Sequence, residues 1–137
     1  MEKVKIKFIK DFSPYPGGRS RSDGPHSAEE FYEDVLRGKF LEAKDNKLEI
    51  TLDGAAGYAG SFLDESFGRL GLEFGFDECK KRLEFITKEE PYLEGDIFSA
   101  IEQWAVDGIH YNSALAEGIE LKENNYFTKV KKGNKKK

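Results

Sequence analysis

Three short stretches of alternating apolar and polar residues, separated by segments of helical periodicity, constrain the possible folds most. They cover residues 3–12, 47–53 and 83–87, and the alternation buries one face of each, as in half-buried strands. Strands that alternate with helices are typical of crossover connections, which join parallel neighbours. The sequence therefore predicts an α/β fold: a small single-layer sheet, mixed but mostly parallel, with helices packed on it.

Capping signals predict the starts of two helices. Residues 27–30 read Ser-Ala-Glu-Glu, a capping box in which the Ser27 hydroxyl accepts a hydrogen bond from the amide of Glu30. This helix is expected to end near Gly38. Ser61 is expected to cap the next helix, again with an acid three residues further on.

A third helix is expected after the last strand, and Pro91 fits its first turn. Its apolar residues recur at i, i+4, i+7 and i+8, the spacing of one helix face: Ile97, Ile101, Trp104 and Ala105. Beyond Gly108 the sequence leaves three possibilities open for residues 109–130. They are more helix, another strand, or a segment lying loosely on the surface.

The charge is distributed unevenly along the chain. A length of 137 residues suits one domain, expected over residues 1–128, followed by a basic tail at residues 129–137 that is expected to be disordered. The tail has six lysines and no acid, so removing it from the net charge of −4 leaves a body charge of −10. A body of that sign repels nucleic-acid phosphates, so we do not expect a nucleic-acid partner.

Other features of the composition exclude further classes of protein. No apolar run approaches the roughly 20 residues of a membrane-spanning helix, so we expect no membrane partner. The first residues alternate like a strand and do not resemble a signal peptide. A single cysteine, Cys79, cannot form an internal disulfide. We therefore expect a cytoplasmic protein.

A loop expected over residues 13–25 carries two arginines in an otherwise acidic body. Three of the four prolines lie there, so neither a helix nor a central strand fits. Arg19 and Arg21 can clamp a phosphate or a carboxylate, and the amides of Gly17 and Gly18 can approach the same anion. Alternatively, the arginines pair with local acids and fix the loop. The local acids considered are Asp23, Glu29 and Asp53.

Ser61 follows a strand and a turn of small residues, which places it at the carboxyl edge of the predicted sheet. Ligands and partners of open parallel sheets meet this edge. Free amides at the helix start favour negative charge, so they would partly stabilise a phosphate on Ser61, while Asp64 and Glu65 would oppose it. The alternative is that the serine only caps the helix, a contribution of about 1 kcal/mol.

Two long motifs in the chain resemble those of bacterial STAS-like domains. They read FSPYPGGRSRSDGP at residues 12–25 and LDGAAGYAGSFLDESFG at residues 52–68, and the resemblance covers residues 3–107. The STAS-like family is distantly similar to the STAS domains of anti-sigma factor antagonists and sulfate transporters. The resemblance implies a STAS-like fold and a signalling role through protein–protein contacts.

The resemblance also implies a site. In the antagonists, the loop after a central strand carries a serine at a helix start, and a partner kinase that is also the anti-sigma factor phosphorylates it. The antagonist pattern Asp-Ser-Ser-Gly-Leu falls on residues 59–63, where Ser61 matches the phosphorylated serine and Ala59 and Gly60 replace the aspartate and the first serine. The implied partner is a kinase-like ATPase regulator. The implied contact residues are Tyr58, Gly60, Ser61 and Phe62.

No nucleophile–base pair emerges from the sequence, which argues against an enzyme. His26 has no orienting partner nearby in the sequence and His110 lies far from it, so they predict neither a catalytic nor a metal site, and we expect no cofactor. Three hypotheses follow. The first is an interaction module centred on Ser61, and the second is a phosphate- or nucleotide-binding domain built on the arginine loop. The third is a small enzyme with Asp23 or His26 as acid–base group beside Ser61.

Overall fold

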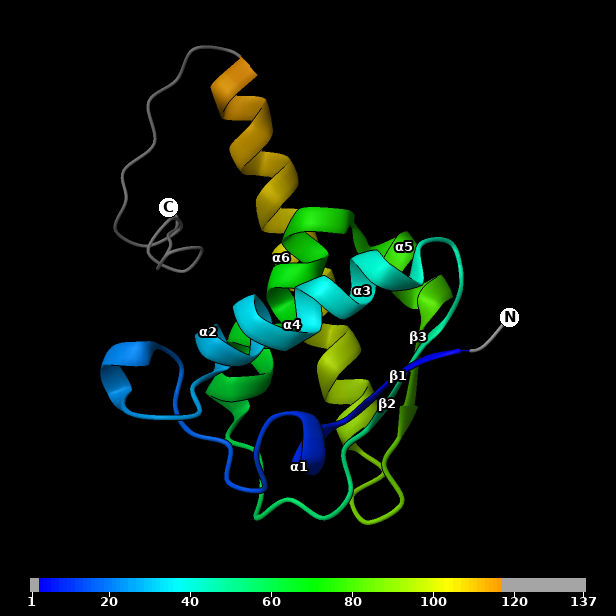
Figure 1. Ribbon diagram of the computed structural model, residues 1–137. Helices are drawn as coiled ribbons and strands as arrows, with labels where there is room; N and C mark the ends of the chain where they lie inside the picture. The colour runs from blue at the N-terminus through cyan, green and yellow to red at the C-terminus, as the bar shows by residue number, and fades with distance from the viewer. Residues whose placement is uncertain (1–2, 117–137) are drawn as a thin grey trace.

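The computed structural model describes residues 3–116, with side chains as far as Gly108, and contains an open three-stranded sheet (Figure 1). The strand order is β1-β2-β3 and both pairings are parallel. The strands are β1 Val4–Lys7, β2 Leu48–Thr51 and β3 Leu83–Ile86. The α/β architecture predicted from the sequence is confirmed, and the sheet is parallel throughout.

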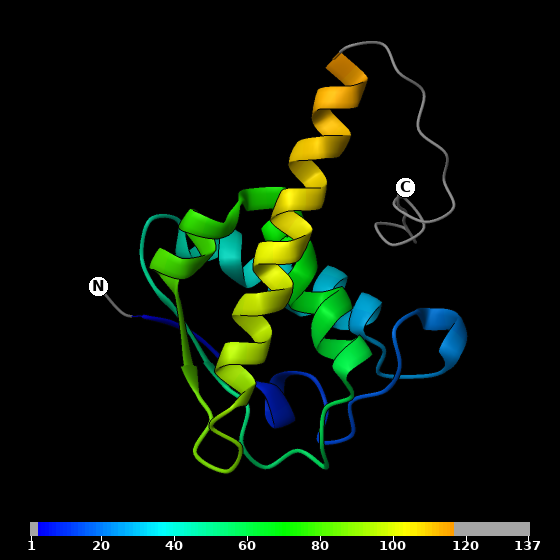
Figure 2. The ribbon, with the colours of Figure 1, turned by 180° about the vertical axis from the view of Figure 1, so that it is seen from behind.

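Helices cover one face of the sheet (Figure 1 and Figure 2), and charged side chains lie on the other. On the helix side, Ile6, Ile50 and Phe85 stand side by side in the three strands. On the other side, Lys3 and Glu84 form an ion pair of 3.0 Å. The helical elements are α1 Phe8–Asp11, η1 Arg21–Asp23, α2 Ala28–Phe31, η2 Tyr32–Leu36, α3 Arg37–Ala43, α4 Gly60–Phe74, α5 Phe76–Arg82 and α6 Leu93–Ala116.

The first strand is shorter than predicted, because it ends at Lys7 and not at residue 12. Phe8 begins the single turn α1, where the Lys7 amide donates to the Asp11 carboxylate at 2.7 Å. Phe8 is fully buried, and its ring centroid lies 4.9 Å from that of Phe31 and 5.1 Å from that of Tyr58. Phe8 therefore packs against aromatic residues of α2 and of the connection between β2 and α4, and the turn α1 takes the place of the last part of the predicted strand.

The helix that starts after Ser27 continues past Gly38 through η2 and α3, further than predicted. The Ser27 hydroxyl accepts from the Glu30 amide at 3.1 Å, which confirms the serine half of the capping box. The Glu30 carboxylate accepts from the amide of His26, one residue earlier than expected. Gly38 is not needed as a helix end, since a Cβ built on it would have no atom within 4 Å. Phe40, two residues further on, is fully buried, and its burial favours continuing the helix.

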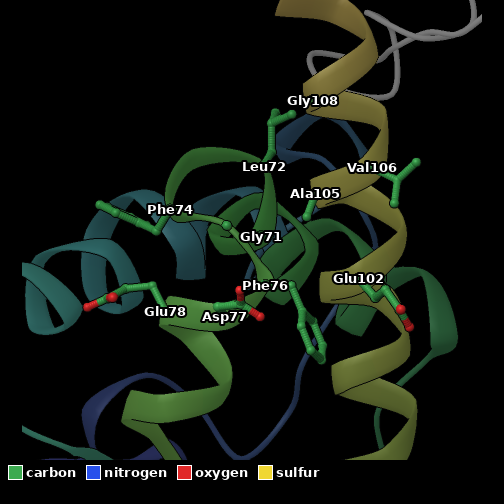
Figure 3. Close-up of a pocket in the computed structure, with 11 residues that line it drawn as sticks. Gly71, Leu72, Phe74, Phe76, Asp77, Glu78, Glu102, Ala105, Val106 and Gly108 are labelled. Carbon is green, nitrogen blue, oxygen red and sulfur yellow. The ribbon is translucent and has the colours of Figure 1, made fainter.

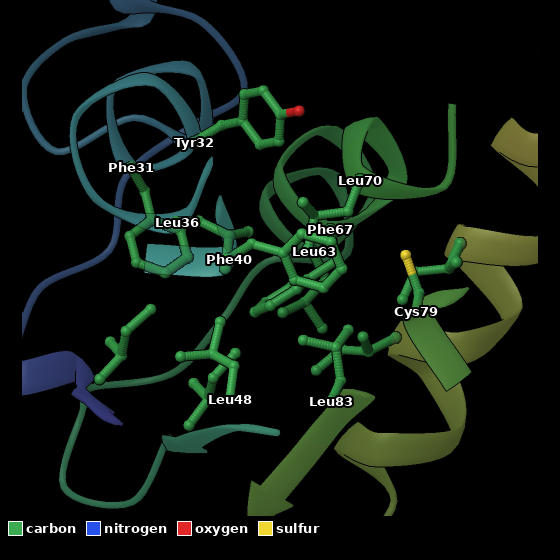
Figure 4. Close-up of a cluster of buried hydrophobic side chains, with 14 of the residues drawn as sticks. Phe31, Tyr32, Leu36, Phe40, Leu48, Leu63, Phe67, Leu70, Cys79 and Leu83 are labelled. Atoms are coloured by element: carbon green, nitrogen blue, oxygen red, sulfur yellow. The ribbon is translucent and has the colours of Figure 1, made fainter. Parts of the chain in front are cut away.

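The core lies between the sheet and the helices, and Figure 4 shows side chains of α4, of the α2–α3 helix and of the strands meeting in one cluster. Within it, α4 and α6 approach closely. A Cβ added to Gly68 would lie 2.4 Å from Cδ1 of Trp104, and one added to Gly71 would lie 2.2 Å from the Ile101 carbonyl oxygen. Glycine is therefore required at both positions of α4.

Of the three possibilities left open for residues 109–130, the structure shows a continued helix as far as Ala116. The basic tail expected at residues 129–137 lies outside the described residues. The helix expected to start at Pro91 starts at Leu93. Although α6 has 24 residues, no helix in the described part of the chain is both long and apolar enough to cross a membrane.

Alanine at Gly71 tests the close approach of α4 and α6. The added methyl group would collide with the backbone of α6, so we expect Gly71→Ala to lower the free energy of unfolding by about 1–3 kcal/mol, the usual cost of overpacking. Urea denaturation followed by circular dichroism measures the change. Gly95→Ala is the matched control, because its Cβ has no neighbour within 4 Å and alanine favours the helix by up to about 1 kcal/mol. Equal effects of the two substitutions would contradict the close packing.

Candidate functional site

The loops at the carboxyl edge of the sheet are tied to one another. The Asp53 carboxylate accepts from the amides of Lys88 at 3.2 Å and Glu89 at 3.0 Å, and the Glu89 carboxylate accepts from the Gly54 amide at 2.8 Å. These bonds join the loop after β2 to the loop after β3. The connection from β2 to α4 is therefore held in place, and it presents residues 59–61 at this edge of the sheet, where the sequence predicted them.

Ser61 is the second residue of α4 and does not cap it, so the predicted serine cap is wrong. The N-cap is Ala59, whose carbonyl accepts from the amides of Phe62 at 2.9 Å and Leu63 at 3.2 Å, and no side chain caps the helix. The helix starts early because the chain is already extended at Ala59, immediately after Gly57 and Tyr58, where Gly57 has a φ of 141°. The half-buried Ser61 hydroxyl has no hydrogen-bond partner among the residues that the structure describes.

The other residues expected to contact a partner differ in exposure. Gly60 is exposed beside Ser61, whereas Phe62 is fully buried and supports the turn from the core. Tyr58 is half-buried, and its hydroxyl donates to the Leu52 carbonyl at 2.7 Å. Burial raises the pKa of Tyr58, so the phenol stays protonated as a donor. The surface of the turn is thus Ala59, Gly60 and Ser61, which Tyr58 and Phe62 hold in shape.

A groove of about 340 Å³ lies next to this turn, between the first turns of α4 and the first half of α6. We call it the Gly60 groove. Its lining residues are Gly60, Leu63, Asp64, Asp96, Ser99, Ala100 and Gln103. The residues from α6 fall on the polar face of the helix, which the sequence reasoning passed over in favour of the apolar face. Their spacing of i, i+3, i+4 and i+7 was the signal that could have found them.

Arg19 reaches α4 close to the Ser61 turn. Its guanidinium lies 2.8 Å from Oδ2 of Asp64 and 3.1 Å from Oε1 of Glu65. Burial opposes the charge of Arg19, but the hydrogen bonds to Asp64 and Glu65 outweigh it and raise the pKa. The second oxygen of Asp64 accepts from the indole nitrogen of Trp104 at 3.0 Å. Asp64 therefore joins the arginine loop, α4 and α6 at one point.

Arg21 points to a different helix. Its guanidinium lies 3.0 Å from Glu33 and 3.3 Å from Asp34, in the helix that starts after Ser27. The pKa of Arg21 is raised, chiefly by its hydrogen bond to Glu33. Both arginines thus pair with acids and fix the loop, which is the second of the two alternatives considered for them. The guanidinium groups do not pair with the expected Asp23, Glu29 or Asp53, because the loop folds back over two helices and brings distant acids into reach. Glu29 still fixes the loop, since its carboxylate accepts from the Arg21 amide at 2.9 Å.

Three of the four residues of the anion hypothesis, Gly17, Arg19 and Arg21, already bond to other groups through the N–H groups that would hold an anion. The Gly17 amide donates to the His26 carbonyl at 2.8 Å, and a Cβ on Gly18 would lie 3.0 Å from the Asp23 Cβ. An anion at Arg19 or Arg21 would have to displace carboxylates from the guanidinium. Phosphate or nucleotide binding by Gly17, Gly18, Arg19 and Arg21 stays a prediction.

No further chemical centre is visible in the described residues. No group of three His, Cys, Asp or Glu residues there could hold a metal ion. His26 has a φ of 60°, and its ring packs edge-on against Phe12 at 5.8 Å. The imidazole therefore takes part in the packing that shapes the loop.

The buried carboxyl group of Glu65 gives the site a specific pH dependence. Burial raises its pKa above the ordinary 4.5, against the opposing effect of Arg69 and Arg19. Unfolding therefore releases a proton between pH 4.5 and the pKa in the folded state, so wild type loses stability relative to Glu65→Gln as the pH rises through this window. Urea denaturation of both proteins between pH 4 and 8 measures the difference.

Glu84→Gln is the control for this pH dependence. The hydrogen bond from Lys3 lowers the pKa of the half-buried Glu84, so the difference between wild type and this variant has the opposite sign. Wild type should lose stability relative to Glu84→Gln as the pH falls. If the free energy of unfolding of wild type minus that of Glu65→Gln stayed constant or increased with pH, burial would not dominate the pKa of Glu65.

Part of the chain matches a known protein family. Residues 27–93 match the family described as STAS-like domain of unknown function (DUF4325). The match runs from the capping serine Ser27 to the first residue of α6, so it includes β2, the Ser61 turn, α4 and β3. It contains the second of the two sequence motifs and leaves out the first, at residues 12–25. No curated protein and no solved structure matches the chain.

Proposed function

We propose that this chain, which belongs over residues 27–93 to the STAS-like domain family, is an interaction module that binds a protein partner at the Ser61 turn. The observation that carries the proposal is the Ser61 hydroxyl. It has no hydrogen-bond partner among the described residues, and it lies in the first turn of a 15-residue helix beside the Gly60 groove. A serine that does not cap its helix is available for a contact or a modification.

The Gly60 groove suits a protein partner better than a small molecule. Its volume of about 340 Å³ is at the low end for small-molecule sites, which are usually enclosed and apolar. Leu63 and Ala100 offer an apolar floor, and Asp96, Ser99 and Gln103 offer a polar rim. An apolar side chain of a partner can enter such a groove while basic groups around it meet the carboxylates. A kinase-like ATPase regulator, the partner that the family resemblance implies, is the proposed occupant.

A phosphate on Ser61 would act as the switch. It would add a charge of about −1.5 to −2 at the helix start, where the first amides of α4 have no helical partner. Asp64 lies one helical turn further on and would repel it, whereas Arg19, now held by Asp64, would be attracted. The phosphate would therefore compete with Asp64 for Arg19 and weaken the link between the loop, α4 and α6.

Arginine at Ser99 tests the docking surface. Ser99 is exposed on α6 and lines the Gly60 groove, so Ser99→Arg fills the groove without disturbing the core. We expect affinity purification from the source organism to recover an ATP-binding regulator with wild type and at least tenfold less with Ser99→Arg. Ser22→Arg, an exposed serine of the arginine loop, is the matched control and should retain the partner. Recovery unchanged by Ser99→Arg, or no such regulator with wild type, would refute the proposal.

Substitutions of Ser61 separate its two interpretations. Because the hydroxyl bonds to no described residue, Ser61→Ala should change the free energy of unfolding by less than about 0.5 kcal/mol, whereas loss of a true serine cap costs about 1 kcal/mol. Ser61→Glu should reduce recovery of the partner, because its carboxylate competes with Asp64 for Arg19 and disturbs the turn, and Ser61→Ala should retain it. A Ser61→Ala variant destabilised by 1 kcal/mol or more, with both variants binding like wild type, would return Ser61 to a purely structural role.

A further inference from the structure

A second and larger groove lies on the other side of the α4–α6 crossing. It has a volume of about 590 Å³ and is bounded by the end of α4, the start of α5 and the middle of α6 (Figure 3). We call it the Phe76 groove. Its apolar lining includes Leu72, Phe74, Phe76, Ala105 and Val106. Val106 is 42% exposed, so this apolar surface is open to solvent.

Carboxylates stand around the Phe76 groove. Asp77 and Glu102 belong to its lining, on α5 and α6 respectively, and both are exposed. Neither forms an ion pair with any residue that the structure describes. The third acid, Glu78, does form ion pairs, at 3.4 Å each, with Lys81 and Arg82. An apolar floor with two unpaired carboxylates at its rim suits an occupant that is apolar and basic at once.

We propose that the occupant is the chain's own C-terminal segment, residues 126–132. Its sequence combines large apolar and basic residues, as the groove favours: Tyr126, Phe127, Lys129, Val130, Lys131 and Lys132. The apolar side chains would cover Val106 and Phe76, and the lysines would meet Asp77 and Glu102. The six lysines at residues 129–137 are attracted by a body of charge −10, which orients the segment toward the domain.

The length of the chain permits this contact. Ala116 lies ten residues beyond Val106 on α6, which is about 15 Å along the helix axis. Nine residues, 117–125, separate Ala116 from this segment, and a chain of that length spans at most about 30 Å, twice the distance to be covered. Since the segment is tethered, its effective concentration at the groove is in the millimolar range, and a weak contact is sufficient to keep it bound.

A spin label on the tail tests the contact in the full-length chain. Gly133→Cys provides the attachment site, because the native Cys79 is fully buried and its pKa is raised to about 12, which leaves its thiol unreactive at neutral pH. We record spectra of ¹⁵N-labelled protein with the paramagnetic label and again after the label has been reduced. We expect the amide signals of Gly75, Asp77 and Val106 to have at most half as much intensity in the first spectrum as in the second. Amides of the distant arginine loop should keep theirs.

Charge removal at the rim supplies the matched control. Asp77→Asn with Glu102→Gln should restore the lost intensity at least in part, whereas Glu42→Gln with Asp45→Asn, exposed acids outside the groove, should not. The same spectra show whether each variant is folded. Broadening spread evenly over the surface, or unchanged by the rim variant, would overturn the proposal.

Mixing two samples distinguishes the chain's own tail from that of a second copy. Protein that carries the spin label but no ¹⁵N is added to ¹⁵N-labelled protein that carries no spin label. We expect no loss of intensity at the groove in the mixture, because the tail binds its own domain. Loss in the mixture equal to that in the singly labelled sample would assign the groove to a neighbouring copy and overturn the proposal.

Discussion

The contact between α4 and α6 at Gly68 and Gly71 determines most of what is distinctive in this molecule. With no side chain on these two residues, the backbone of α4 lies against Ile101 and Trp104, closer than any other residue would allow. The Trp104 ring lies over Gly68, and its indole nitrogen thereby reaches Asp64 one turn earlier in α4. A tight crossing of two helices leaves open space on both sides of it, where the helices diverge. The Gly60 groove and the Phe76 groove are these two spaces.

Charged residues, and not apolar ones, connect the arginine loop to this crossing. The loop is rich in proline and glycine and buries little of its own, yet Arg19 holds Asp64 and Glu65 of α4, and Arg69 lies 2.8 Å from the same Glu65. A buried ion pair adds little net stability, because desolvation of the charges offsets their attraction. Its effect is to select one geometry. Since the selecting groups are charges next to Ser61, a new charge at Ser61 can act on the loop through them.

The sequence predicted the parts of this arrangement that depend on local pattern. Alternation located the three strands, and the small residues after β2 correctly placed Ser61 at the carboxyl edge of the sheet. The cap itself was misassigned because serine is the better capping side chain, whereas the helix start is decided by backbone geometry after Gly57, whose φ of 141° favours glycine. The partners of Arg19 were beyond reach for another reason. Asp64 lies 45 residues away along the chain, and no local spacing indicates such a pair.

Both grooves are lined by α6, so an occupant of one groove can affect binding in the other without a conformational change. The Gly60 groove uses α6 residues up to Gln103, and the Phe76 groove begins at the adjacent residue Glu102. Successive residues of a helix point about 100° apart, so occupants of the two grooves would lie on neighbouring faces and would not collide. Their charges would still interact, because screening at physiological salt extends over about 8 Å. A lysine segment at Glu102 would neutralise part of the field around the Gly60 groove and weaken its attraction for a basic partner, so that electrostatics alone would couple the tail to partner binding.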